Sequence, residues 1–215
     1  MARTHPSAEE REARRDELLD AAVDAIRAHG AGVSMEEIAK AAGVTKPILY
    51  RHFGHRDGMI AALATRYAGQ LQATLQQALD TSGLIEPRTT VSSTIDAYLT
   101  FVERDPDVYR FLVVRLLTEP AADPAVSLGN FISQVGNQIA LVLGEQLRAA
   151  GLDSGGAEPL AHGIVGMVHA AGDWWLERRS MPRARLVEYL TTLLWQGLGG
   201  MGLGDPAGTT TEESR

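Results

Sequence analysis

Apolar residues return every three or four positions through most of the chain, and the first such run is 18–26. Ser7 and Glu10 precede this run with the spacing of a capping box, in which each side chain binds the backbone amide of the other residue. Gly30 follows it, and glycine is common just after the end of a helix. The pattern therefore predicts a helix over about 9–29.

Two short helical segments come next. Ser34 and Glu37 repeat the capping-box spacing, which predicts a helix that begins at Ser34 and stops at Gly43. Thr45 is the expected N-cap of the following helix, which ends near Phe53.

The turn between these two helices has the composition of a helix-turn-helix. Gly43 permits the tight turn, and Ile38, Val44 and Leu49 have the spacing to fill the wedge between the helices. The second helix would then expose hydroxyl, cationic and aromatic side chains, which are groups that read the DNA major groove. A solvated polar face is the alternative interpretation of the same pattern.

From Arg56 onward the helical pattern continues in one long run to about Ala78. Prolines and glycines divide the rest of the chain into five further helical segments, at 88–104, 106–118, 124–150, 157–179 and 183–198. No segment alternates as a strand does, and no internal repeat is present. The sequence thus predicts an all-α protein of about nine helices. Residues 200–215 are rich in glycine, threonine and glutamate and are expected to form a mobile tail.

The charge of the chain is unevenly distributed. A formal net charge of −7 over 215 residues argues against a DNA partner, because binding to phosphates is driven by Lys and Arg. Residues 1–56, however, contain nine basic and nine acidic side chains, so the whole negative excess lies beyond residue 56. This asymmetry is typical of a DNA-facing module joined to an acidic body. Cysteine is absent, which suits a reducing compartment and rules out disulfides and thiolate metal sites.

Several classes of function lack their sequence signals. Residues 2–15 are charged where a secretory signal would be apolar, and no apolar run approaches the ~20 residues of a membrane span, so we expect a soluble cytoplasmic protein. The chain has no phosphate-binding glycine loop, no HExxH motif and no Ser-His pairing that the spacing supports. We therefore expect neither an enzyme nor a bound cofactor.

The segment 33–54 carries the most specific motif of the chain. Its sequence, VSMEEIAKAAGVTKPILYRHFG, resembles the DNA-binding signature of the TetR family of bacterial repressors, and the ending LYRHF is the most specific part. The match covers about the first 65 residues, and the order of the later helices is similar to the nine-helix plan of that family. The resemblance implies an N-terminal three-helix DNA-binding domain, expected at 1–55, and a C-terminal helical domain for effector binding and dimerisation, expected at 56–199.

The resemblance also implies roles for individual side chains at the DNA. The residues implied to bind phosphates, and so to set the register of the protein on the duplex, are Ser34, Thr45, Tyr50, His52 and Arg56. The residues implied to read bases are Lys46, Pro47 and Arg51. The two cations can donate to a guanine edge, and the proline ring can contact a thymine methyl group.

Two positions depart from the usual family pattern at the start of the fourth helix. His55 stands where a serine or asparagine commonly caps that helix, and Gly58 weakens its first turn, so we expect a poorly capped start. In or before the first helix, Arg11, Arg14 and Arg15 can either reach flanking phosphates or pair with neighbouring carboxylates.

Beyond residue 56 the sequence contains apolar stripes rather than reactive groups. Most of these side chains are expected in the core, but the resemblance implies an effector cavity among the fourth to eighth helices with a chiefly apolar lining. Since each buried CH₂ group contributes about 0.8 kcal/mol, an elongated hydrophobic effector could bind there with few polar contacts. The candidate effector-binding residues are Tyr67, Leu71, Tyr98, Phe111, Gln134, Asn137, His169 and Trp174.

Some polar groups of this body have two interpretations. Gln134, Asn137 and Gln138 could anchor an effector or face solvent. His169 and Asp173 lie one helical turn apart, and a histidine hydrogen-bonded to that aspartate is preferred over a metal site because no third ligand is close.

The last two predicted helices concentrate apolar residues between Trp174 and Trp195. The resemblance implies that they form a homodimer interface, and the core of a monomer is the competing interpretation. Two recognition helices about 34–36 Å apart would read successive major grooves of a palindromic double-stranded operator. We therefore expect a DNA-binding transcriptional regulator, by the usual mode of the family a repressor, that a small hydrophobic effector releases from DNA. A helical small-molecule or lipid carrier without DNA binding is the alternative.

Overall fold

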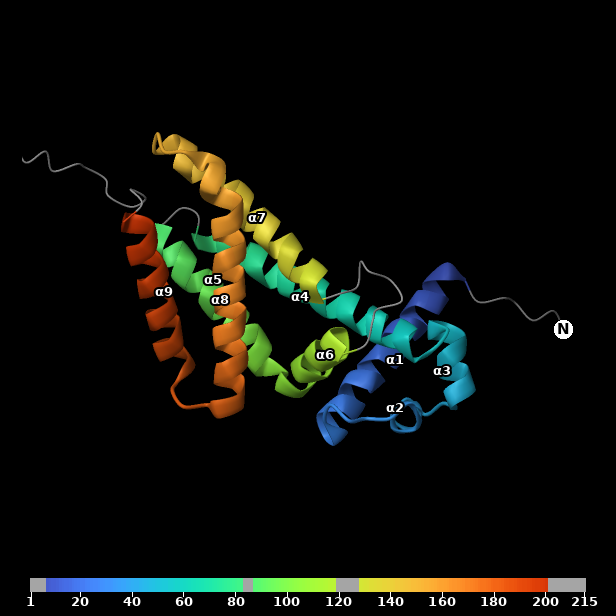
Figure 1. Ribbon diagram of the computed structural model, residues 1–215. Helices are drawn as coiled ribbons and strands as arrows, with labels where there is room; N and C mark the ends of the chain where they lie inside the picture. Colours follow the sequence, from blue (N-terminus) through green and yellow to red (C-terminus); the bar gives the residue numbers. More distant parts are fainter. Residues whose placement is uncertain (1–6, 83–86, 119–127, 201–215) are drawn as a thin grey trace, which may run out of the picture. The chain divides into compact units, whose positions relative to one another are not determined.

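The computed structural model describes residues 7–82, 87–118 and 128–200, and all regular elements in these ranges are helical (Figure 1). The α-helices are α1 (Ala8–His29), α2 (Met35–Ala41), α3 (Lys46–Phe53), α4 (Arg56–Ser82), α5 (Pro87–Arg104), α6 (Pro106–Thr118), α7 (Leu128–Ala149), α8 (Ala157–Arg178) and α9 (Arg183–Gly200). A short 3-10 helix, η2 (Ser154–Gly156), precedes α8. The all-α fold and the order of its helices are therefore confirmed. Residues 124–127 of the seventh predicted helix and residues 201–215 of the predicted tail lie outside the described residues.

The helices divide into two compact units. One unit contains residues 1–71 and 102–131, and so combines α1, α2, α3 and most of α4 with α6. The other contains residues 72–101 and 132–215, and so combines the end of α4 with most of α5 and with α7, α8 and α9. No helix in the described ranges is both long and apolar enough to cross a membrane.

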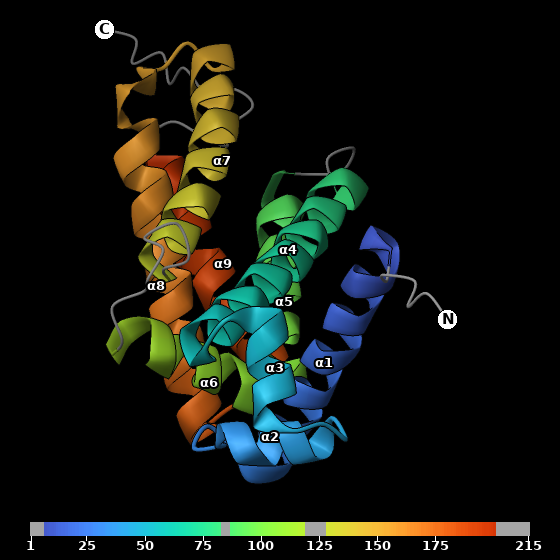
Figure 2. The same ribbon diagram turned by 90° about the vertical axis from the view of Figure 1, so that its right-hand side faces the viewer.

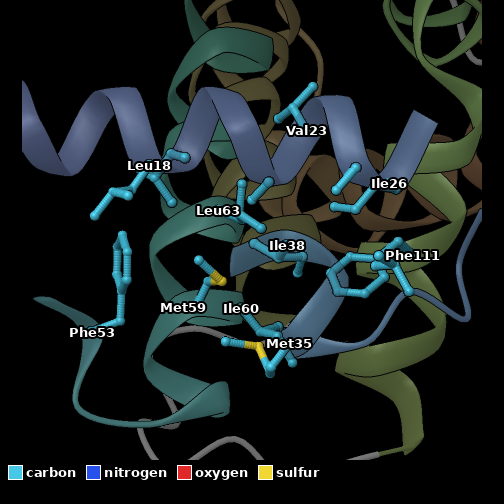
Figure 3. Close-up of a cluster of buried hydrophobic side chains, with 14 of the residues drawn as sticks. Leu18, Val23, Ile26, Met35, Ile38, Phe53, Met59, Ile60, Leu63 and Phe111 are labelled. Atoms are coloured by element: carbon cyan, nitrogen blue, oxygen red, sulfur yellow. The ribbon is translucent and has the colours of Figure 1, made fainter. Parts of the chain in front are cut away.

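One hydrophobic core holds the first unit together. The inner face of α1 is central to it, and Figure 3 shows Leu18 and Ile26 of α1 pointing toward side chains of α2, α4 and α6. The residues that α2 and α3 contribute include Ile38 and Leu49, which are fully buried. Burying one such side chain stabilises the fold by about 1.5–3 kcal/mol. Because α2 and α3 have only 7 and 8 residues, this burial rather than helix propensity must hold them in place.

A polar network joins α1 to the segment between α5 and α6 within the same unit. The Arg27 Nε atom donates to Asp105 Oδ1 at 2.7 Å, and Asp105 is also hydrogen-bonded to Tyr67 of α4. The hydrogen bond from Arg27 is the largest cause that lowers the pKa of the Asp105 carboxyl group. Burial, chiefly, raises the pKa of the Tyr67 phenol to about 12. The network therefore fixes the start of α6 against α1 through a nearly buried carboxylate.

Replacing Asp105 with asparagine should lower the free energy of unfolding at pH 7 by about 1 kcal/mol, because Arg27 loses its ionic partner but remains half exposed to screening solvent. The pKa of the Asp105 carboxyl group is lower in the folded protein than its unfolded-state value near 4, so the charged carboxylate stabilises the fold above that pH. This stabilisation is lost as the pH falls through the folded-state pKa. The difference between D105N and the unmodified protein should therefore shrink below about pH 4. Urea unfolding at several pH values measures this. The matched control is D24N, which removes the other, well-exposed carboxylate on Arg27 and should cost less than about 0.5 kcal/mol. Equal losses in the two variants would contradict the role given to Asp105.

The start of α4 differs from the sequence expectation. His55 does cap this helix, because its Nδ1 atom accepts from the Gly58 backbone amide at 3.3 Å. Gly58 is required by packing rather than being a weakness, since a Cβ atom there would lie 1.9 Å from the carbonyl oxygen of Phe53. The expectation of a poorly capped start was therefore wrong: an imidazole takes the place of the usual hydroxyl or amide, and the glycine lets α4 approach the end of α3.

Replacing Gly58 with alanine should destabilise the protein by at least about 2 kcal/mol, because the new methyl group meets a backbone oxygen that cannot rotate away. Gly69 offers a matched control in the same helix, since it is exposed and a Cβ atom there meets nothing within 4 Å. G69A should stabilise α4 by up to about 1 kcal/mol. Thermal and urea unfolding of the two variants should thus shift in opposite directions, and a neutral G58A would contradict the contact.

In the second unit, α8 turns through residues 179–182 into α9, which runs back beside it in both views (Figures 1 and 2). Trp175 of α8 is buried, and its indole Nε1 atom donates to the Met181 carbonyl oxygen at 2.7 Å, which holds this turn in place. The α5 helix contacts both α8 and α9. The hydroxyl of Tyr98 in α5 lies 3.1 Å from Nδ1 of His169 in α8, and Arg183 of α9 donates to Asp96 of α5 at 2.8 Å. Sequence spacing suggested Asp173 as the partner of His169, whereas the contact that the structure shows at Nδ1 is Tyr98.

Candidate nucleic-acid interface

The capping box of α2 is formed as the sequence predicts. The Glu37 amide donates to Ser34 Oγ at 3.2 Å, and the Ser34 amide donates to Glu37 Oε2 at 2.8 Å. The Ser34 hydroxyl also donates to Glu37 Oε2 at 2.8 Å, and these bonds lower the pKa of the Glu37 carboxyl group. Ser34 therefore fixes the start of α2 first, and a phosphate would have to share its hydroxyl with Glu37.

A tight turn sets the angle between α2 and α3. Gly43 has a positive φ of 63°, a conformation that glycine adopts without strain, and its amide donates to the Lys40 carbonyl oxygen. The Val44 amide returns to the Ala39 carbonyl oxygen at 2.9 Å, and Val44 packs against the core of the unit. The wedge predicted from spacing is thus present between the two helices.

The start of α3 leaves Thr45 exposed. Thr45 occupies the N-cap position as expected, but its side chain makes no capping hydrogen bond, so that part of the prediction was wrong. The backbone carbonyl oxygen of Thr45 instead accepts from Ile48 and Leu49. Pro47 stands in the first turn, where its missing amide costs no helical hydrogen bond. The Thr45 hydroxyl is therefore not engaged in the cap.

The sides of α3 have different environments. Leu49 and Phe53 are buried against the core, whereas Pro47 and Arg51, which lie four residues apart and so on one face, are exposed. Lys46 and Tyr50 form another such pair, with Lys46 Nζ 5.7 Å from the centre of the Tyr50 ring. Pro47 and Arg51 thus form an exposed ridge on α3, and the Lys46–Tyr50 pair lies beside this ridge.

Several predicted contact residues meet at one open hollow of the surface. The side chains and backbone that line it come from the loop before α2, from α2 and α3, and from the start of α4. The lining residues are Gly32, Val33, Ser34, Met35, Glu36, Lys46, Tyr50 and Arg56. Four of the eight residues expected at DNA are in this list, although they come from three separate parts of the sequence. Among the charged lining residues, Glu36 is the one that the sequence did not assign to DNA.

The end of α3 is held by α1. Arg15 Nη1 donates to the His52 carbonyl oxygen at 3.2 Å, and its guanidinium lies 4.9 Å from the centre of the Phe53 ring. Burial, followed by the nearby charges of Arg51, Arg14 and Arg15, lowers the pKa of the His52 imidazole. Both causes favour the neutral form of the ring, which can donate one hydrogen bond without adding charge. The sequence left Arg15 undecided, and its contacts give it a structural role.

The neighbouring arginine differs, because Arg14 pairs with Glu17 at 2.6 Å on the exposed side of α1. This is the carboxylate pairing that the sequence offered as one alternative for these cations. An exposed pair of this kind contributes little stability and opens readily.

The candidate effector-binding residues are divided between the two units. In the first unit, Phe111 is part of the hydrophobic core, Leu71 is buried and Tyr67 is bonded to Asp105. In the second unit, Tyr98 and His169 are in contact, as described above. The remaining three are exposed, namely Gln134 and Asn137 on α7 and Trp174 on α8. Their roles toward an effector stay predictions. Among the described residues, no group of three or more His, Cys, Asp or Glu side chains is placed to hold a metal ion.

Comparison with models of known protein families identifies the family of this chain. Residues 18–63 match the model of the bacterial regulatory proteins of the TetR family, and residues 74–208 match the tetracyclin repressor-like C-terminal domain. The chain belongs to the TetR family. Members of this family are helix-turn-helix transcriptional regulators rather than enzymes, so the alternative of a carrier without DNA binding loses its support.

Curated relatives of this TetR-family protein are transcriptional regulators. An uncharacterised helix-turn-helix regulator of Mycobacterium tuberculosis (strain H37Rv) is 32% identical over 190 residues, which are 87% of this chain and 78% of the relative. The transcriptional activator FasR of Mycolicibacterium smegmatis is 31% identical over 195 residues, which are 87% of this chain and 84% of FasR.

Solved structures share the fold of this TetR-family chain at low sequence identity. A transcriptional regulator of Pseudomonas aeruginosa PAO1 superposes with a TM-score of 0.72 and 18% identity, covering 88% of this chain and 91% of that one. FadR of Bacillus subtilis, solved in complex with stearoyl-CoA, has a TM-score of 0.65 and 16% identity, covering 85% and 98%. These likenesses concern the fold alone.

Proposed function

We propose that this TetR-family regulator binds a double-stranded operator by placing α3 in the major groove. The observation that carries the proposal is the convergence of Ser34, Lys46, Tyr50 and Arg56 on one open hollow beside the exposed ridge of α3. Ser34 also caps α2, but the two cations that meet it on this open surface are not part of the hydrophobic core, and a DNA backbone crossing the hollow would use all of these groups together. The exposed ridge would then face the base edges.

The environments of the side chains support a division of roles. Tyr50 and Arg56 line the hollow, where a phenol and a guanidinium can donate to phosphate oxygens. Thr45 is exposed at the N-cap of α3, beside the first amides of the helix, which also favour an anion. The His52 ring adds a hydrogen-bond donor at the end of α3. In the proposal these groups, with Ser34, bind phosphates.

The residues proposed to read bases lie on or beside the ridge. Arg51 is exposed and can donate two hydrogen bonds to a guanine, and Pro47, on the same face, can contact a thymine methyl group. Lys46 is the third, at the first position of α3.

Two substitutions separate phosphate binding from base reading. Tyr50→Phe keeps the half-buried ring and removes only the hydroxyl group, so it should weaken binding to all DNA sequences alike, by roughly tenfold. Arg51→Ala should cost about 1–3 kcal/mol on the operator and relax the preference at one base pair of each half-site. Fluorescence anisotropy with duplexes selected from a random pool, and with single base-pair changes in them, measures both effects.

The control for the loss of a charge is Arg104→Ala, which removes an exposed cation at the end of α5 and should leave the base preference unchanged. The salt dependence provides a second criterion: with about 6 phosphate contacts, the slope of log K against log salt should be near −5. A flat salt response, or an R51A variant with the original base preference, would overturn the placement of α3.

We further propose that the protein is a homodimer through α8 and α9. The apolar residues of these helices are divided by the fold: Trp175 and Leu190 are buried within the chain, whereas Trp174 and Leu193 are 45% and 59% exposed. The buried residues fit the core of a monomer, and the exposed ones support the proposed subunit interface. Tyr189 is also exposed, so α8 and α9 carry large apolar side chains on their outer surfaces that a second subunit would bury.

The proposed effector is an acyl chain, and the proposed response is release from DNA. Two relatives support the ligand class by their names: FadR of Bacillus subtilis was solved with stearoyl-CoA, and FadR of Bacillus halodurans is a fatty acid degradation regulator. AlkX from Dietzia is a repressor, whereas FasR is an activator. The composition of the second unit supports an apolar ligand, since its helices carry few charges between their ends.

Stearoyl-CoA should weaken operator binding, whereas free coenzyme A should not, because the acyl chain supplies the apolar area that is buried. A preference of ~3 kcal/mol for the released conformation would weaken operator affinity by roughly 150-fold. Octanoyl-CoA should act only at higher concentrations, since it has fewer CH₂ groups to bury. Anisotropy titrations of operator complexes with the three compounds measure this. Tighter operator binding with stearoyl-CoA would reverse the proposed direction, and no response to it would exclude the proposed ligand class.

A further inference from the structure

The ammonium group of Lys46 already has an anionic partner. Lys46 Nζ donates to Glu36 Oε1 at 2.5 Å, which joins the first residue of α3 to the first turn of α2. Both residues line the hollow that the proposed function gives to the DNA backbone. The charge of Lys46 is therefore already neutralised by Glu36 in its present position.

Glu36 lies in the first turn of α2, where a carboxylate is favourable to the helix dipole, but it is not part of the capping box. The capping box of α2 uses Glu37, so the helix start does not need a second carboxylate for its hydrogen bonds. The Glu36 side chain is 66% exposed, and its negative charge faces a surface where phosphates would come close. A carboxylate in this place weakens binding to any DNA and is therefore a cost to the proposed function.

We propose that Glu36 is a specificity-determining residue that withholds Lys46 from phosphates and releases it only to a base edge of the operator. This inference rests on the proposed function. On a DNA duplex of arbitrary sequence, Lys46 would exchange the Glu36 carboxylate oxygen for a phosphate oxygen. The exposed Glu36 carboxylate would then remain unpaired beside the phosphates. On the operator, a guanine O6 and N7 edge meets Lys46 together with the neighbouring contacts of Pro47 and Arg51. Specificity is a difference between two affinities, and Glu36 increases it by lowering the non-specific one.

The test compares Glu36→Gln with the unmodified protein on the selected operator duplex and on a scrambled duplex of equal length. Glutamine keeps the length and polarity of the side chain but frees Lys46 for phosphates. Non-specific binding by a protein with two such heads should tighten roughly tenfold. The slope of its log K against log salt should steepen by about one for each head. Operator binding should tighten less, so the ratio of the two affinities should fall.

Two further variants show whether the pair itself is responsible. Glu12→Gln removes the same charge from an exposed position of α1, and it should change both affinities slightly and alike. In a Lys46→Gln background, Glu36→Gln should no longer change the specificity ratio, because there is no cation left to release. The inference is overturned if Glu36→Gln acts equally with and without Lys46, or no differently from Glu12→Gln. It is also overturned if Glu36→Gln weakens operator binding alone, which would mean that Glu36 itself contacts a base.

The failure of this inference differs from the failure of the proposed function. If the unmodified protein does not distinguish the operator from the scrambled duplex, both fail together. If it does, and Tyr50→Phe weakens both complexes while Glu36→Gln leaves the ratio unchanged, only the role of Glu36 is refuted.

Discussion

The DNA-binding unit depends on the burial of two helices that are too short to be stable alone. Isolated helices below about 12–15 residues are marginal in water, and α2 and α3 have 7 and 8. Their inner side chains, Ile38 and Leu49 among them, are buried against the long α1. Every group at the candidate interface is therefore placed by a core that never meets DNA. Local contacts refine this placement: Ser34 starts α2, and Arg15 of α1 holds the end of α3.

The same core includes an element that follows α5 in the sequence. Val108 and Phe111 of α6 pack with the helix-turn-helix residues, and the Asp105 carboxylate fixes the beginning of α6 to Arg27. The helix-turn-helix is thus completed by a helix that the chain reaches only after leaving the first unit along α4 and returning along α5. Because α6 packs against α1 and α1 holds the end of α3, a displacement of α6 would also displace α1 and α3. The position of α3 thus depends on α6 as well as on the helices of the helix-turn-helix itself.

The sequence predicted the helices well because each boundary depends on neighbouring residues. Capping boxes at Ser7 and Ser34 and breaks at glycine and proline are local signals, and the structure contains both boxes. The errors occurred where a role depends on a distant part of the chain. Gly58 looked unfavourable by helix propensity, but the deciding fact is the position of the Phe53 carbonyl oxygen. Likewise, neither the pairing of Glu36 with Lys46 nor that of His169 with Tyr98 follows from spacing, because helix packing creates these contacts.

The close approach at Gly58 also bears on how this protein can vary. A single-nucleotide change in a glycine codon that alters the amino acid always introduces a residue with a Cβ atom. At position 58 that atom would meet the Phe53 carbonyl oxygen whether the new side chain were small or large, polar or apolar. Backbone geometry rather than side-chain chemistry therefore excludes substitutions at position 58, and a small side chain would be tolerated no better than a large one. Eleven residues later, at Gly69, the same nucleotide changes would meet open space. Mutational tolerance along α4 should thus be lowest where the helix leaves α3 and should rise within three turns.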